Sequence, residues 1–264
     1  MNQTILYAFI ATIGTWFMTA LGAGTVVFFK QPKKKVMNLM LGFAAGVMIA
    51  ASFWSLLLPA VTRAEGGRIP EYIVVVVGFI AGAIFVWVSD KILSMAIAKA
   101  KVENKCVKSN RIAMLILSIT LHNIPEGLAV GVAFGVLERV GMNAESIMGA
   151  AVIAIGVAIQ NFPEGAAVSL PLRREGYTRG KSFFLGQASG MVEPIAGVIG
   201  AATVIHIQSI LPFALSFAAG AMILVAVHEL IPECQSEKNK LPYLATMGII
   251  GGFAVMTWLD IMLG

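Results

Sequence analysis

Residues 145–171 read ESIMGAAVIAIGVAIQNFPEGAAVSLP, a long apolar segment interrupted by Gln160, Asn161 and Glu164. An α-helix rises 1.5 Å per residue, so a helix of this length crosses the roughly 30 Å hydrocarbon core of a bilayer. A carboxylate inside a membrane is costly, and it is retained where it faces the protein interior or an ion. The segment therefore predicts a membrane-spanning helix with a polar site for a cationic ligand near its middle.

The sequence HNIPEG at residues 122–127 nearly repeats QNFPEG at residues 160–165, and it also lies inside a long apolar run. Residues three and four apart share one face of a helix, so each motif offers its carboxylate and its other polar groups on one side. Each motif proline removes a backbone N–H and frees the carbonyl four residues earlier, which protein, water or an ion can satisfy. Two copies at matched depth indicate a shared site. Its candidate ligands are His122, Asn123, Glu126, Gln160, Asn161 and Glu164.

The chemistry of these candidate ligands limits which cations the site can bind. Imidazole together with carboxylates suits zinc and the neighbouring divalent transition metals, whereas calcium favours an all-oxygen site. Two bridging carboxylates fit two metal ions, and one ion with shared ligands fits equally well, so the spacing leaves both alternatives open. The metal is expected as a transported substrate, and no prosthetic group is predicted.

The composition assigns the chain to the membrane. Its 264 residues are 58% hydrophobic and 12% charged, which is too apolar for a soluble domain of this size. Residues 1–264 are predicted to form a single all-α transmembrane domain, a bundle of eight helices. The apolar runs lie at about 4–29, 37–60, 70–95, 111–136, 145–171, 182–206, 210–231 and 241–262.

The distribution of basic residues predicts the orientation. Of the 19 Lys and Arg residues, all but Arg63, Arg68 and Arg139 flank the odd-numbered loops. Cytoplasmic loops carry the excess of Lys and Arg, so both termini are expected to be extracytoplasmic. The net charge of +5 then reflects topology and contact with anionic lipid, which argues against nucleic acid as a partner.

Three further groups are candidates outside the paired motifs. Glu193 precedes Pro194 midway along the sixth run and is a third candidate carboxylate for the site. His228 and Glu229 lie near the cytoplasmic end of the seventh run, where they suit a weaker site for a leaving ion. The helical zinc-protease pattern needs a second histidine four residues after the first, and Pro232 stands there. A zinc protease of that type is therefore disfavoured.

With both motifs identified, the whole chain resembles the ZIP (Zrt/Irt-like) family of divalent-metal transporters, close to its bacterial GufA-like branch. The resemblance implies a zinc-type site formed by the two motifs with Glu193, and it adds Met48 of the second run as a ligand. It also implies a homodimer, elevator-like alternating access and a plasma (inner) membrane location. Asn161 stands where some bacterial relatives have aspartate, which lowers the charge of a second metal position.

The favoured hypothesis is uptake of a divalent transition metal, zinc first, with iron, manganese and cadmium as further candidates. The ion would enter from outside, bind at mid-membrane and leave inward past His228 and Glu229. The alternative is a membrane-embedded zinc-dependent hydrolase that uses metal-bound water, but the chain has no recognisable substrate motif. A metal sensor ranks third because no signalling domain is present in the sequence. The protein is thus predicted to be a transporter and not an enzyme.

Overall fold

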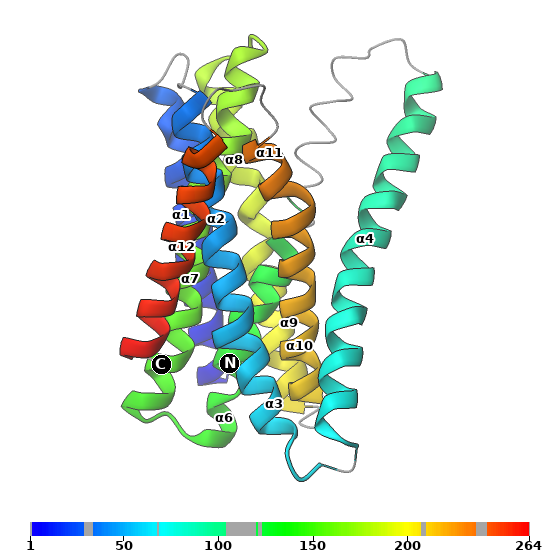
Figure 1. Cartoon of the computed structure of the whole chain (residues 1–264), viewed down its shortest axis with the longest axis vertical. Helices are drawn as coiled ribbons and strands as arrows, with labels where there is room; N and C mark the ends of the chain where they lie inside the picture. The colour runs from blue at the N-terminus through cyan, green and yellow to red at the C-terminus, as the bar shows by residue number, and fades with distance from the viewer. Residues whose placement is uncertain are drawn as a thin grey trace.

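The protein is all-helical wherever its structure is described. Within those ranges the chain forms helices joined by short turns and contains no strand, and the helices follow the long axis of the molecule (Figure 1). The all-α, polytopic membrane fold predicted from the sequence is confirmed. The computed structural model describes residues 2–28, 34–67, 69–103, 120, 123–206, 210–235 and 242–263.

Seven helical stretches in the described ranges are long and apolar enough to cross a membrane, and they match seven of the eight predicted spans. They are Gln3–Val27, Lys35–Ala64, Glu71–Ile92, Ala144–Arg173, Arg179–His206, Leu211–Gln235 and Tyr243–Met262.

The remaining predicted span, at 111–136, is described only at residue 120 and over residues 123–136, of which 120 and 123–135 are helical. Helix α4 (Glu71–Glu103) ends at one end of the molecule, and the short α6 (Leu137–Val140) lies at the other (Figure 1). Both termini lie at the same end of the molecule as α6 (Figure 1).

One group of helices packs around α1. Helix α1 lies against α7, α8 and α9, and α7 also contacts α8. Asn143 starts α7 by accepting a hydrogen bond from the Ser146 amide at 2.8 Å, and the helix then continues through Pro163. The bounds are α1 (Gln3–Gly24), α7 (Ala144–Arg174), α8 (Arg179–Ala188) and α9 (Val192–His206), with the 3₁₀ turns η1 (Thr25–Val27) and η3 (Ser189–Met191).

A second group packs around α2 and α10. Helix α12 lies along α2, and α4 lies along α10, while α2 also contacts α7 and so joins the two groups. The bounds are α2 (Lys34–Ala51), α3 (Leu58–Ala64), α10 (Leu211–Val225), α11 (Ile231–Gln235) and α12 (Pro242–Leu263).

Two π-helical segments continue α2 and α10. They are η2 (Ser52–Leu57) and η5 (Ala226–Leu230), and each precedes a proline, Pro59 or Pro232. A proline has no N–H for the regular helical hydrogen bond, and wider turns of this kind are frequent at functional sites. Helices α3 and α11 follow these segments and continue the two spans past the predicted ends at 60 and 231.

Small residues bring the helices together. A Cβ atom at Gly127, Gly131 or Gly135 would overlap the backbone of α9, at Glu193, Gly197 and Ala201 respectively. Such close approach is typical of helix pairs in membranes, where packing substitutes for the hydrophobic effect. The helix over residues 123–135 is thus fixed directly on α9.

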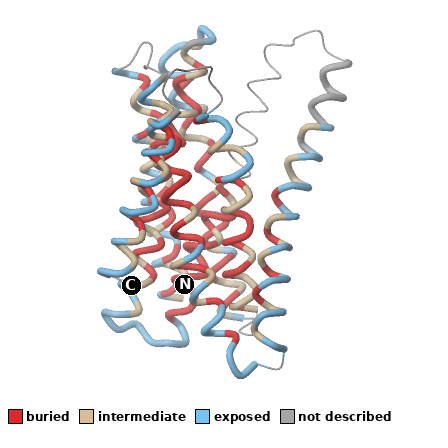
Figure 2. The backbone as a smooth tube through the Cα atoms, in the orientation of Figure 1, coloured by how far each residue is buried: buried red, intermediate tan, exposed pale blue. Residues whose placement is uncertain are grey.

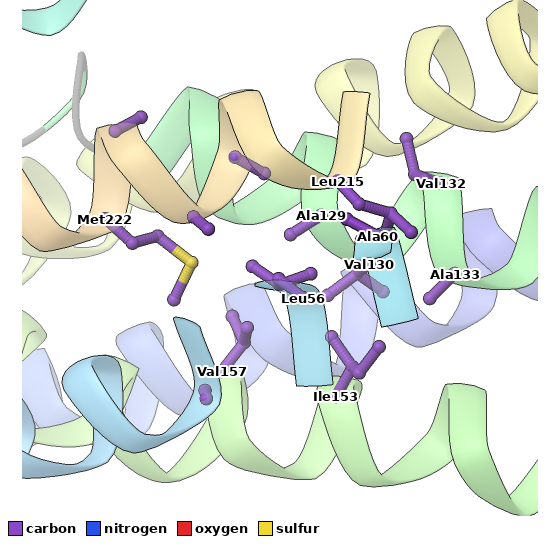
Figure 3. Close-up of a cluster of buried hydrophobic side chains, with 14 of the residues drawn as sticks. Leu56, Ala60, Ala129, Val130, Val132, Ala133, Ile153, Val157, Leu215 and Met222 are labelled. Atoms are coloured by element: carbon purple, nitrogen blue, oxygen red, sulfur yellow. The ribbon is translucent and has the colours of Figure 1, made fainter. Parts of the chain in front are cut away.

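Buried residues fill the centre of the bundle, and exposed ones cover its outside (Figure 2). Many of the exposed residues on α4 and α12 are large and apolar, including Trp87 at 52% and Trp258 at 58% exposure. Inside, an apolar cluster joins α2, η2, α3, α7, α10 and the helix over residues 123–135; Leu56, Val130, Ile153 and Leu215 belong to it (Figure 3). An apolar exterior around an apolar core is the arrangement of a protein surrounded by lipid.

Candidate metal site

The two repeated motifs meet inside the bundle. Asn123 and Glu126 come from the helix over residues 123–135, and Gln160, Asn161 and Glu164 come from α7. Four of these side chains are completely buried, and Glu164 is 6% exposed. The Gln160 Nε2 atom donates a hydrogen bond to Glu126 Oε1 at 2.5 Å, which joins the motifs directly.

Oxygen atoms without hydrogen-bond partners gather in these motifs. Leaving a buried polar atom unpaired costs about 1–3 kcal/mol, so a group of such atoms needs an explanation. Cation binding provides one, because carbonyl and carboxylate oxygens are all electron-pair donors. Among the described residues, the unpaired buried oxygens of the motifs are Asn123 Oδ1, Glu126 Oε2, Gln160 Oε1, Asn161 Oδ1 and Glu164 Oε1.

The carboxylates of the site interact with one another through space. Glu126 interacts electrostatically with Glu164 and Glu193, and Glu164 also interacts with Glu229 on η5. Ionised carboxylates in one site repel each other, and a divalent cation between them would offset the repulsion. The site therefore combines interacting carboxyl groups with unpaired oxygens in a buried place.

Glu193 differs from the other two carboxylates because both of its oxygens accept hydrogen bonds. Its Oε2 accepts from Thr15 Oγ1 at 2.5 Å and from Asn161 Nδ2 at 2.8 Å, and its Oε1 accepts from Thr19 Oγ1 at 3.4 Å. Glu193 is completely buried and lies on α9, beside Gly127. Glu193 was predicted from the sequence as a candidate carboxylate of the site, whereas its contacts with Thr15 and Thr19 were not predicted.

The remaining candidate ligands are placed differently. His122 lies outside the described residues, and among those described no three His, Cys, Asp or Glu side chains form a metal-binding group. Met48 is completely buried on α2, the helix that contacts α7. His228 is exposed on η5, and Glu229 beside it is half-buried. Their roles as ligands stay predictions.

The buried threonines of α1 follow a spacing that can be recognised in the sequence. Thr4, Thr12, Thr15 and Thr19 recur at helical spacing in an otherwise apolar span, and all four are buried. In lipid such hydroxyls either bond to their own helix or reach across to another. Thr19 reaches across to Glu193, Thr15 does so and also contacts the Thr12 carbonyl of its own helix, and Thr12 bonds to the carbonyls of Ala8 and Phe9.

The fold and this site define a polytopic helical membrane protein with a buried cluster of carboxyl and amide groups, an arrangement typical of proteins that bind ions within the bilayer. The family model described as ZIP Zinc transporter matches residues 100–260. The chain therefore belongs to the ZIP zinc transporter family.

Several relatives extend this match along the whole chain. It is 38% identical to the protein named Zinc transporter ZIP11 from Homo sapiens, across 100% of this chain and 99% of that protein. It is 34% identical to Zinc transporter ZIPB from Bordetella bronchiseptica, across 98% and 82%. It is 32% identical to Zinc transporter GufA from Myxococcus xanthus, across 93% and 94%. All three carry transporter names, so the alternative of a zinc-dependent hydrolase gains no support.

Proposed function

We propose that this protein carries divalent transition-metal ions, zinc first, through the membrane by way of the buried site between the helix over residues 123–135 and α7. The observation that carries the proposal is the set of unpaired buried oxygens in the two motifs. A soft or borderline ion such as zinc takes carboxylate and imidazole ligands together, and His122 adjoins the described part of the site in sequence. The names of the relatives support zinc as the ion.

The direction of transport in this proposal is inward. The ion binds at Glu126 and Glu164 and then leaves past Glu229 and His228 on η5. The electrostatic interaction between Glu164 and Glu229 supports this order, because it links the central site to the segment that continues α10. The exposure of His228 supports a role at the end of the path.

The location and assembly belong to the same proposal. Both termini face the outside of a plasma membrane, as the distribution of Lys and Arg indicates. The homodimer follows from the resemblance to the family alone. Light scattering of the purified protein in detergent tests it: a protein mass twice the 27.9 kDa of one chain is expected, and a mass of one chain would contradict it.

The experiment that tests the function is uptake of radioactive zinc into liposomes containing the purified protein. The wild type should show saturable uptake, and the Glu126→Ala/Glu164→Ala double variant should lose it. Glu145→Ala, which removes an exposed carboxylate from the first turn of α7, is the matched control and should keep uptake. Zinc binding by the wild type without uptake would contradict the proposal and favour a sensor.

A further inference from the structure

Helix α1 presents its buried threonines to Glu193. The Thr15 hydroxyl donates to Glu193 Oε2 at 2.5 Å, with the Thr12 carbonyl as a second acceptor at 3.0 Å, and the Thr19 hydroxyl donates to Glu193 Oε1 at 3.4 Å. Both threonines and Glu193 are at most 1% exposed. Hydrogen bonds to a carboxylate are about twice as strong as those between neutral groups, and a dry environment strengthens them further. Glu193 is thus tied to α1 through both of its oxygens.

Asn161 completes a closed triangle with Thr15 and Glu193. Its Nδ2 atom donates to Glu193 Oε2 at 2.8 Å and to the backbone carbonyl of Thr15 at 3.1 Å. The amide group has two N–H donors, and both now have acceptors. A flipped amide would bring its oxygen against these two oxygens and lose both bonds. The triangle therefore fixes which way the Asn161 side chain faces.

The fixed orientation leaves one atom of Asn161 for the site. Its Oδ1 atom is buried and has no hydrogen-bond partner among the described residues, like the oxygens of Gln160 and Glu164 on the same helix. An oxygen that is held in place and unpaired is ready to contact a cation. Outer residues that orient a ligand in this way are worth about 10- to 100-fold in metal affinity.

We propose that Thr15 and Glu193 are positioning residues that hold the amide oxygen of Asn161 toward the transported cation. Glu193 acts through Asn161, because its Oε2 atom accepts the hydrogen bond that orients the Asn161 amide and shares that oxygen with the Thr15 hydroxyl. Thr15 contributes twice, through its hydroxyl and through its carbonyl. The inference rests on the proposed function, and it assigns to α1 a part in a site otherwise built from the two motifs.

The first test removes the Thr15 hydroxyl and keeps the shape of the side chain. In calorimetric titrations of the purified protein with zinc, Thr15→Val should weaken binding by about 10- to 100-fold. Thr15→Ser, which keeps the hydroxyl, should bind zinc as the wild type does. Thr12→Val is the matched control, because this buried hydroxyl on the same helix bonds only to carbonyls of α1. Equal zinc affinity in the wild type and Thr15→Val overturns the inference.

The second test asks whether Thr15 acts through Asn161. In an Asn161→Ala background, Thr15→Val should have no further effect on zinc affinity, because the group that it orients is gone. Independent, multiplying losses in the two variants overturn the inference. The comparison requires that every variant is folded. Elution volumes in gel filtration and helical content that match those of the wild type show this.

The third test separates a positioning role from a ligand role for Glu193. Glu193→Gln should lower zinc affinity and leave the number of zinc ions bound at saturation unchanged. Loss of one bound ion would identify Glu193 as a ligand and overturn the inference. A wild-type protein that binds no zinc would overturn the proposed function and this inference together, whereas zinc binding that is insensitive to Thr15 overturns this inference alone.

Discussion

Glu164 contributes an unpaired buried oxygen to the site and interacts electrostatically with two other carboxyl groups, those of Glu193 and Glu229. Glu164→Gln keeps the size of the side chain and removes its negative charge. Zinc uptake by Glu164→Gln should therefore fall by at least about tenfold, the smallest loss typical of disturbed metal sites. Initial uptake rates across a range of zinc concentrations measure the loss. An uptake curve like that of the wild type would remove Glu164 from the ligands.

The pH dependence of zinc binding follows from the same residues. Metal ligands bind in their deprotonated forms, so zinc and protons compete for the site and binding releases protons. Affinity should decrease as the pH falls from about 7.5 to about 5, where an unperturbed histidine is protonated. Zinc titrations at several pH values, repeated in buffers of different ionisation enthalpy, measure both affinity and released protons. Constant affinity over this range would show that the ligands are other residues.

The sequence predicted the central residues of the site because they repeat. Gln160 and Glu126 were expected to meet, and they share a hydrogen bond. Thr15 was not expected, because a threonine in an apolar span is ordinary by composition and its partner lies far away in the chain. The contact between Thr15 and Glu193 arises only when α1 packs against α9, and no local pattern encodes that pairing.

At the scale of the helix, the contact between α1 and α7 depends on two glycines. A Cβ atom at Gly22 would overlap the Phe162 carbonyl, and one at Gly165 would overlap the Thr19 carbonyl. Gly22→Ala should therefore destabilise the protein by about 1–3 kcal/mol, the usual cost of overpacking. It should also lower zinc uptake, because it separates α1 from the helix that carries Asn161.

A matched substitution on the same helix controls for the added methyl group. A Cβ atom at Gly14 would meet no other atom within 4 Å, so Gly14→Ala should leave stability unchanged or raise it by up to about 1 kcal/mol. Thermal unfolding of both variants in detergent distinguishes them. Equal melting temperatures would mean that α1 and α7 are not closely packed at Gly22.

The hydropathy of the sequence predicted the existence of the spans more accurately than the residues at which they end. The spans ending at 60 and 231 in the prediction continue to Ala64 and Gln235. Each span has a π-helical segment, η2 or η5, just before a proline, and it continues as a helix, α3 or α11, through that proline. A proline usually predicts the end of a regular helix, and the wider turn that accommodates it depends on packing against the neighbouring span. Such turns have no simple sequence pattern.

At the scale of the whole molecule, a layer of apolar side chains lies between the central site and the end that holds the termini. It includes Leu56, Val130 and Ile153, none of them more than 8% exposed. Figure 3 shows these side chains pointing toward one another from different helices. A hydrated ion does not pass such a layer, so uptake from that side requires the helices around it to separate.

Labelling with a membrane-impermeant maleimide tests both the orientation and this closed layer in intact cells. In a Cys106→Ser/Cys234→Ser background, a cysteine at the exposed Met142 should react from outside, and one at the exposed Gly180 should react only after the membrane is opened. Met142 lies in the loop at the end of the termini, and Gly180 lies at the other end. The reverse pattern would invert the orientation.

A cysteine at Ile153 probes the layer itself. Ile153 is 8% exposed and Met142 is 43% exposed, although both lie on the side of the site that faces the termini. In zinc-free medium, Ile153→Cys should therefore react much more slowly than Met142→Cys, because the layer must open before the reagent can reach it. Equal rates would show that water already reaches the middle of the bundle from outside. The zinc path would then be open on that side without any movement of α2 or of the helix over residues 123–135.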